Sequence, residues 1–149
     1  MSSLVLTIRE SIRYRGRGGH YSWIAHRIAG LAILFFLIIH VWETANAHFY
    51  PELYAWFLQV FKFPPIAVGE IPLIGAVFFH AINGIRITIL DFKPEWWKHQ
   101  QKSVAITWIL FAVIFIPIAI YMLIAMVDHC TAAGPACWQF PAISDYIGG

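Results

Sequence analysis

The amino-acid sequence predicts an all-α integral membrane protein with three transmembrane helices. Its composition is 60% hydrophobic and only 12% charged, which is too apolar for a soluble domain of 149 residues. Three stretches are long enough to cross a hydrocarbon core of about 30 Å, which needs about 20 mostly apolar residues each. We predict spans over Ser22–Ala45, Ile66–Leu90 and Val104–Val127.

Each element has its own sequence features. The segment before the first span, residues 1–21, is basic, and its short apolar stretch without a small-residue cleavage site does not fit a secretory signal. The first span contains a run of mostly apolar residues that ends directly before His40, and the second contains His80. The third is the plainest, because its 24 residues carry no charge, although Pro117 can bend it.

The basic residues predict the orientation of the spans. Lys and Arg gather before or early in the first span and between the second and third spans: Arg9, Arg13, Arg15, Arg17, Arg27, Lys93, Lys98 and Lys102. The loop between the first two spans has only Lys62, and the tail, residues 128–149, has no Lys or Arg. The positive-inside rule therefore predicts a cytoplasmic N-terminus and 91–103 loop, and a C-terminus outside. Tryptophans fall near span ends, as interfacial anchors do: Trp23, Trp42, Trp96 and Trp97.

Two features lie in the predicted outer regions. The aromatic-rich segment Tyr50–Phe63 is expected to form a short helix on the membrane surface. Cys130 and Cys137 form either a disulfide, which an oxidising compartment permits, or two unpaired thiols. Their spacing fits neither a zinc site nor an iron–sulfur cluster. The sequence has no Gly-rich phosphate loop and no nucleophile triad, and nothing in it indicates nucleic-acid binding.

The histidines inside the apolar spans are the main indication of function. An ionisable side chain at bilayer depth is costly, so it usually marks a site. Neutral imidazole is a common ligand of haem iron. His40 and His80 therefore indicate electron transfer in a membrane. Two other polar residues have simpler interpretations: Asn83 is expected to bond across helices, and Glu70 to be a solvated loop charge, or alternatively a proton acceptor.

A b-type haem between helices needs two axial imidazoles, polar or cationic groups near its propionates, and small residues where the macrocycle meets backbone. The second span offers these in order, as His80, Gly84 one turn later and Arg86. The first span offers the His26–Arg27 pair, with Gly30 one turn beyond His26.

On a regular helix His26 and His40 lie within about 40° of each other and about 21 Å apart along the axis. One face of the first span therefore carries an imidazole near each end.

Two segments carry a resemblance to a known family. Ser22–Gly30, and His80–Arg86 together with Asp91, resemble the cytochrome b556 membrane-anchor subunit of succinate dehydrogenase (complex II). The resemblance covers Ser22 to Val127, with three spans in the same order, and the combined motifs are more specific than either alone.

The resemblance implies roles for individual residues. The histidine that matches His80 is an axial ligand of haem b in that family. The pair that matches His26 and Arg27 lies by the haem propionates and the quinone pocket, and the acidic residue that matches Asp91 lies near that pocket. Arg86 and Gly84 are expected to contact the haem.

The sequence departs from the family pattern at two places. Many relatives have a quinone-pocket serine four residues before the arginine, where this chain has Trp23, and Ser22 is one residue earlier. We expect Ser22 and Trp23 to border the pocket, although the shift weakens the case for Ser22. The second departure is His40, which matches a ligand of the distal haem in two-haem members. The resemblance favours two haems b, with metal ligands His40 and His80 and the opposing ligands from a second anchor subunit. One haem clamped by both histidines is the alternative.

The resemblance implies a multi-pass subunit of the inner (cytoplasmic) membrane. It would anchor a flavoprotein subunit and an iron–sulfur subunit, and with the second anchor subunit form the site at which succinate-derived electrons reduce a quinone, with menaquinone favoured. The chain has no flavin or succinate site, so it is expected to be a subunit and not a complete enzyme. One alternative is the anchor of a quinol:fumarate reductase, since the sequence does not determine direction. The other is a haem-free membrane scaffold in which the histidines link helices.

Overall fold

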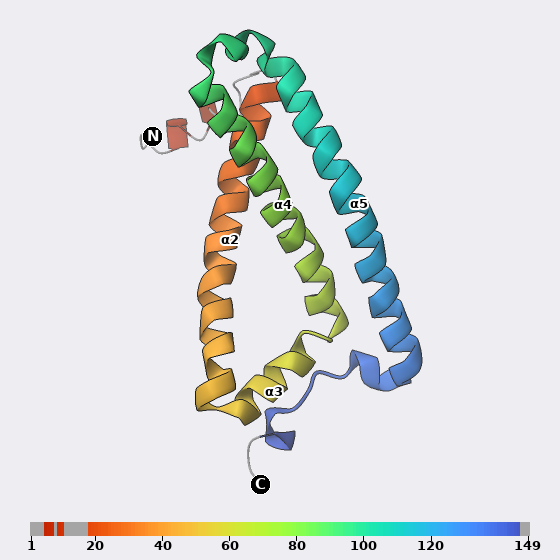
Figure 1. The fold of residues 1–149 in the computed structure, drawn as a ribbon. Helices are drawn as coiled ribbons and strands as arrows, with labels where there is room; N and C mark the ends of the chain where they lie inside the picture. The colour runs from red at the N-terminus through yellow and green to blue at the C-terminus, as the bar shows by residue number, and fades with distance from the viewer. Residues whose placement is uncertain (1–4, 8, 11–17, 147–149) are drawn as a thin grey trace.

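The computed structural model describes residues 5–7, 9–10 and 18–146. Three long helices run up and down in sequence, and a short helix joins the first to the second at one end (Figure 1). The long helices are α2 (Gly18–Phe49), α4 (Pro64–Phe92) and α5 (Gln100–Ala133), and the shorter elements are α3 (Pro51–Val60), η1 (Pro94–His99), η2 (Gly134–Trp138) and η3 (Ile143–Asp145). No strand is present in these residues, which confirms the predicted all-α fold.

Three helices long and apolar enough to cross a membrane are present, as predicted, and each contains one predicted span and extends beyond it. At 32, 29 and 34 residues, they are about 48, 44 and 51 Å long at 1.5 Å per residue. Each contains an apolar window suited to crossing a membrane, so this is a multi-pass membrane protein. Because a hydrocarbon core is only about 30 Å thick, the ends of these helices reach past it.

Prolines and one glycine set several helix ends. Pro51, Pro64 and Pro94 each begin a helix, where the missing N–H costs nothing. Gly134 follows α5 with a φ of 59°, a left-handed conformation that glycine adopts without strain. A helix within Tyr50–Phe63 is present as α3, as predicted, and its position on the membrane surface stays a prediction.

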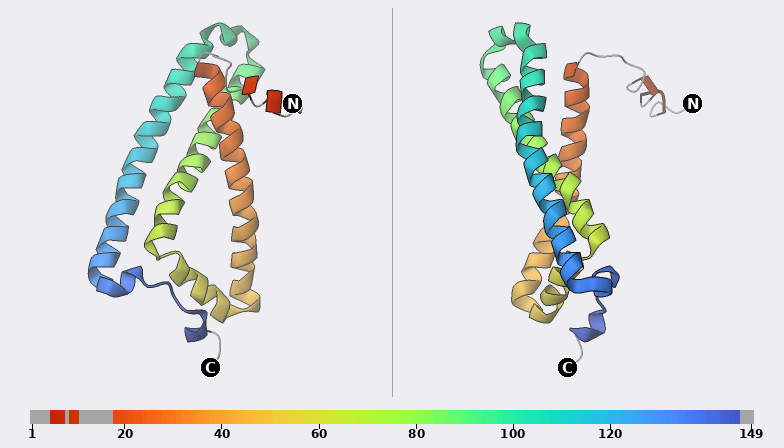
Figure 2. Two further views of the ribbon diagram at one scale, coloured as in Figure 1. Left: turned by 180° about the vertical axis from the view of Figure 1, so that it is seen from behind. Right: turned by 90° about the vertical axis from the view of Figure 1, so that its right-hand side faces the viewer.

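The long helices are arranged as a splayed triangle. We call the end where α2 starts and η1 joins α4 to α5 the basic end, and the end spanned by α3 the distal end. Helices α2 and α4 lie close together near the basic end and diverge toward the distal end (Figures 1 and 2). Helix α5 packs on α4 through an aromatic cluster in which the Phe79 ring lies 4.7 Å from the Trp108 ring and 5.6 Å from the Phe111 ring.

Little of the apolar surface is covered within the chain. In the most apolar windows of α2, α4 and α5, 6%, 22% and 0% of the residues are buried. Such faces are stable only against lipid or against other membrane helices. The chain therefore presents most of its helical surface to the bilayer or to partner subunits.

The C-terminal tail is fastened to the distal end. A disulfide joins Cys130 to Cys137, which decides between the two states that the sequence left open. Farther along, the indole N–H of Trp56 in α3 donates to the Pro141 carbonyl oxygen at 2.9 Å, and the Phe140 ring packs against Trp56. The tail thus crosses beneath α3 (Figure 1).

Three of the basic residues that predict the orientation lie outside the described residues, namely Arg13, Arg15 and Arg17. The cytoplasmic placement of the basic end stays a prediction. The division of the chain into residues 1–21, 22–127 and 128–149 also remains an interpretation of the sequence.

Candidate functional site

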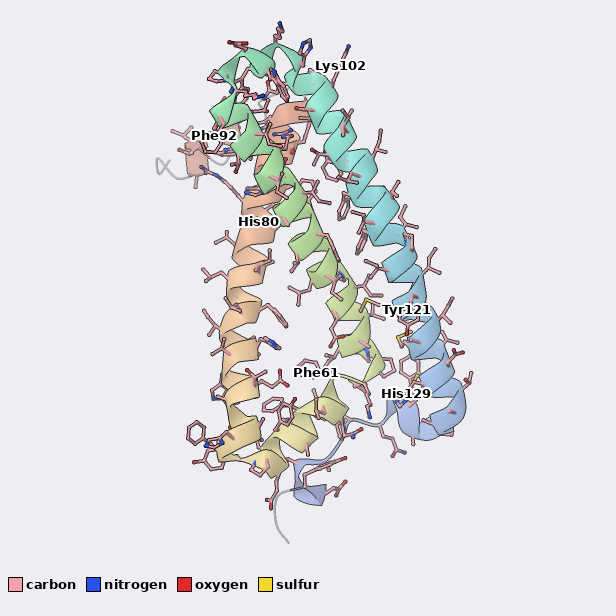
Figure 3. All side chains as sticks on the ribbon, viewed as in Figure 1. Phe61, His80, Phe92, Lys102, Tyr121 and His129 are labelled. Carbon is pink, nitrogen blue, oxygen red and sulfur yellow. A yellow bond between two sulfur atoms is a disulfide. The ribbon has the colours of Figure 1, made fainter. Side chains whose placement is uncertain are left out.

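Two histidines meet where α2 and α4 lie closest. The rings of His26 and His80 stack with centroids 3.9 Å apart and planes within 5° of parallel. Figure 3 labels His80 on the part of α4 that lies beside α2. Because each ring comes from a different helix, the stack fixes the two helices relative to one another.

A hydrogen bond selects the tautomer of the neutral His80 ring. Its Nδ1 lies 3.1 Å from the backbone carbonyl oxygen of His26. A carbonyl oxygen can only accept, so Nδ1 carries a proton, and in the neutral imidazole Nε2 then keeps its lone pair. Metal-binding histidines in proteins commonly donate their second ring N–H to a carbonyl in this way.

Glycines on the opposite helix accommodate both rings. A Cβ atom at Gly84 of α4 would lie 3.6 Å from the His26 ring, and Gly30 of α2 faces the His80 ring. The two His-x-x-x-Gly motifs therefore interlock: each histidine lies over the glycine of the other helix. In the isolated chain the neighbour of Gly84 is the His26 imidazole, and the predicted contact of Gly84 with a haem stays a prediction.

One turn toward the basic end, a polar pair joins the same helices. Ser22 Oγ donates to Asn83 Oδ1 at 2.8 Å, and both residues are fully buried. This confirms that Asn83 bonds across helices. It also shows that the Ser22 hydroxyl is engaged between α2 and α4 and does not line an open pocket.

Several buried donors beside this pair have no partner among the described residues: Asn83 Nδ2, Arg86 Nε, Arg86 Nη1 and, where protonated, His26 Nδ1. Leaving such groups unpaired away from water is costly. The three residues lie on neighbouring turns at the α2–α4 contact. The arrangement fits an oxygen-rich or anionic group brought by a cofactor or another subunit.

The remaining predicted quinone-site residues lie at the basic end. The Arg27 guanidinium lies 3.8 Å from the centre of the Trp23 ring, in a cation–π contact, and both side chains are exposed in the isolated chain. Asp91 is exposed in the last turn of α4, and within the described residues it forms no ion pair. The structure thus joins Arg27 to Trp23 but does not bring Asp91 into contact with them.

At the distal end, His40 lies in different surroundings. Its Nδ1 is 3.6 Å from Glu43 Oε2, and its ring stacks on Phe36 with a centroid distance of 5.2 Å. The His40 side chain is 48% exposed, whereas that of Glu43 is only 5% exposed. One side of His40 is thus held by its own helix and the other is open.

His40, Glu43 and Glu70 line a common pocket of about 420 Å³ where α2 and α4 diverge. Helix α3 covers it with Tyr54, and Glu70 is half-buried in its wall. Glu70 is therefore not the solvated loop charge that the sequence suggested.

The two predicted metal ligands lie at different depths. His80 lies against Gly30, and His40 follows Gly30 by ten residues on the same helix. Ten residues correspond to about 15 Å along the axis. Within this chain the two imidazoles are therefore too far apart to share one iron.

The comparison with known proteins agrees with this architecture. Residues 9–129 match the family described as succinate dehydrogenase/fumarate reductase transmembrane subunit. The chain belongs to this family. A relative from Mycobacterium tuberculosis (strain ATCC 25618 / H37Rv), named succinate dehydrogenase 2 membrane subunit SdhC, is 37% identical over 116 residues, which cover 78% of this chain and 85% of the relative. The resemblance seen in the sequence is thereby confirmed for a succinate dehydrogenase membrane-anchor subunit.

Sequence reasoning overlooked Glu43 of the anchor subunit. A carboxylate three residues after His40 lies on nearly the same helix face, and an acidic residue in an apolar span is itself an indication of a site. What the sequence could not show is that Glu43 and Glu70 face one pocket. That depends on the angle between α2 and α4.

Proposed function

We propose that this anchor subunit binds haem b and helps form the quinone site of a succinate:quinone oxidoreductase. It would anchor the flavoprotein and iron–sulfur subunits at the basic end and pack against a second anchor subunit in the inner membrane. The observation that carries the proposal is the His80 ring, held by one nitrogen with the other left free for a metal.

The residues around His80 fit a haem. Its Nε2 would hold the haem iron together with a ligand from the second anchor subunit. The unpaired donors of Arg86, Asn83 and His26 would hold propionate oxygens, which relieves the cost of burying them. When bound, the group supplies one-electron storage close to the quinone.

His40 would ligate a second haem near the distal end. The separation of about 15 Å from His80 along the helix axis supports two groups and not one shared clamp. Glu43 would accept a hydrogen bond from His40 Nδ1 and leave Nε2 for the metal, as the His26 carbonyl does for His80. By resemblance, two haems favour menaquinone as the quinone.

The quinone would bind at the basic end beside Arg27. A quinone that takes up two electrons and two protons becomes a quinol and passes through negatively charged states. The Arg27 guanidinium, oriented by the Trp23 ring, would stabilise that charge at the carbonyl oxygen. Asp91 would lie near the entrance and exchange protons with water. Ser22, engaged with Asn83, would support the wall of the pocket and not touch the quinone.

Two alternatives remain for the same fold. The family description includes fumarate reductases, so the complex could run from quinol to fumarate. A haem-free scaffold is the other, and the direct contact of His26 with His80 is the observation that favours it, because the stack already links two helices.

Spectroscopy of the purified complex tests the proposal. We expect a b-type band in the reduced-minus-oxidised spectrum and about two haems per flavin. Absence of this band would leave the haem-free scaffold as the function of the chain. The ratio of succinate-oxidation to fumarate-reduction rates, each with quinone or quinol of defined type, would identify the direction.

A substitution tests the quinone site separately. Arg27→Leu removes the charge but keeps an apolar stem, and we expect quinone reduction to fall by about tenfold or more with haem content unchanged. Lys102→Leu, a basic residue on α5 away from the Trp23 contact, is the matched control. Equal loss in both variants would indicate a general effect of basic charge at the membrane surface.

A further inference from the structure

Gly30 of α2 lies against the His80 ring. A Cβ atom at this position would lie 2.9 Å from His80 Cε1 and 3.4 Å from His80 Nδ1. The first distance is shorter than the contacts that real Cβ atoms make. Any side chain at position 30 would therefore push the imidazole away.

The His80 ring has little freedom to yield. Its face is covered by the His26 ring at 3.9 Å, and its Nδ1 is bonded to the His26 carbonyl oxygen. A shift that relieves the contact with position 30 must break the stack, lengthen the hydrogen bond or spread α2 from α4. Each of these changes the direction of His80 Nε2.

The backbone conformation at position 30 does not require a glycine. It lies within α2, and no described glycine other than Gly134 has a positive φ. Alanine is a better helix former than glycine. The reason for a glycine here is thus the imidazole of the other helix and not the backbone.

We propose that Gly30 is a positioning residue for the His80 imidazole, since it lets the ring lie against the α2 backbone with Nε2 aimed at the metal. The inference rests on the proposed ligation of haem by His80. The corresponding glycine of the other motif is Gly84, where an added Cβ atom would lie 3.6 Å from the His26 ring. This is an ordinary contact distance, so only Gly30 has to be a glycine to fit the opposing ring.

The chain offers two matched controls for Gly30→Ala. At Gly75 of α4 an added Cβ would also lie 2.9 Å from a ring, but that ring is Phe115. Gly75→Ala therefore introduces an equally close contact without touching a histidine. At Gly69 nothing lies within 4 Å, so Gly69→Ala reports only the change in helix propensity.

The experiment compares the three variants as assembled complexes. The readouts are haem per flavin, the reduced-minus-oxidised spectrum and the EPR g values of the oxidised haem. We expect Gly30→Ala alone to shift the g values or to lower occupancy of the haem on His80 at least threefold. An unchanged Gly30→Ala spectrum, or the same shift in Gly75→Ala, would overturn the inference.

A double variant covers the case in which Gly30→Ala does not assemble. Methionine also ligates haem iron, and its flexible chain can yield to a new Cβ atom. In a His80→Met background, Gly30→Ala should therefore assemble and leave the spectrum of the single His80→Met variant unchanged. A further loss in the double variant would overturn the inference, because the defect would then not arise at the imidazole.

The wild-type complex distinguishes failure of this inference from failure of the proposed function. A wild-type complex without haem would overturn the proposed ligation as well, whereas a haem-containing wild type with an unaffected Gly30→Ala variant would overturn the inference alone.

Discussion

The two ends of the α2–α4 pair hold their histidines in contrasting ways. At the basic end the helices are close, and His80 is fixed by a ring stack, a carbonyl and a glycine. At the distal end the helices have diverged, and His40 faces an open pocket with one weak ion-pair contact to Glu43. The same residue type is thus held by the opposite helix at the first end and only by residues of its own helix, Phe36 and Glu43, at the second.

The contrast has a simple physical origin. Glycines at the crossing let two backbones approach, so a ring from one helix reaches the carbonyl groups of the other. Without such residues the gap widens, and polar side chains must meet across a cavity or through a ligand. Near the basic end the two helices therefore contact each other directly, whereas toward the distal end they leave a pocket between them.

The sharpest test of the contrast is His80→Ala. We expect complete loss of the haem at the basic end with the distal haem retained, so haem per flavin falls by about half. His99→Ala, which removes an exposed histidine at the start of α5, is the control. A variant that keeps its full haem content would mean that His80 is not a ligand.

His40→Ala should remove only the distal haem. Because His40 is about 15 Å from the level of His80 along the helix axis, the spectrum of the basic-end haem should remain. His48→Ala, an exposed histidine on the same helix, is the matched control. Loss of all haem from both the His40 and the His80 variants would instead indicate one shared site.

Ser22→Ala tests how firmly the basic end is held. The variant loses the interhelical bond to Asn83, and such bonds in membranes contribute about 0.6 kcal/mol on average and rarely more than about 2 kcal/mol. We expect a small drop in the melting temperature of the complex and an unchanged KM for quinone. Ser103→Ala, whose hydroxyl bonds only to the Gln100 carbonyl of its own segment, should change less. A raised KM for quinone without loss of stability would instead indicate that Ser22 contacts the quinone.

Reducing the Cys130–Cys137 disulfide should have the smallest effect on the cofactors. The bond closes a short loop at the end of α5, and the tail beyond it contacts α3 through Trp56. We expect faster chymotryptic cleavage near Phe140, which is 53% exposed, and no change in haem content. The Cys130→Ser and Cys137→Ser pair should reproduce the result. A change in the distal haem spectrum would show instead that the tail and α3 shape the His40 pocket.

The sequence by itself determined the number and order of the spans, the helix over Tyr50–Phe63 and the family. Apolar runs of about 20 residues and motifs such as His80–Arg86 are local properties, so they can be read without knowing how helices pack. It also indicated that Asn83 bonds across helices, because an amide in an apolar span needs a partner.

Only the tertiary structure decided which side chains meet. The stack of His26 on His80, the close contact at Gly30 and the bond between Ser22 and Asn83 join residues 50 or more positions apart. The shared pocket of Glu43 and Glu70 likewise depends on where α2 and α4 diverge. Spacing along a helix gives the face on which a residue lies, but the angle and register between helices follow from close packing over the whole contact.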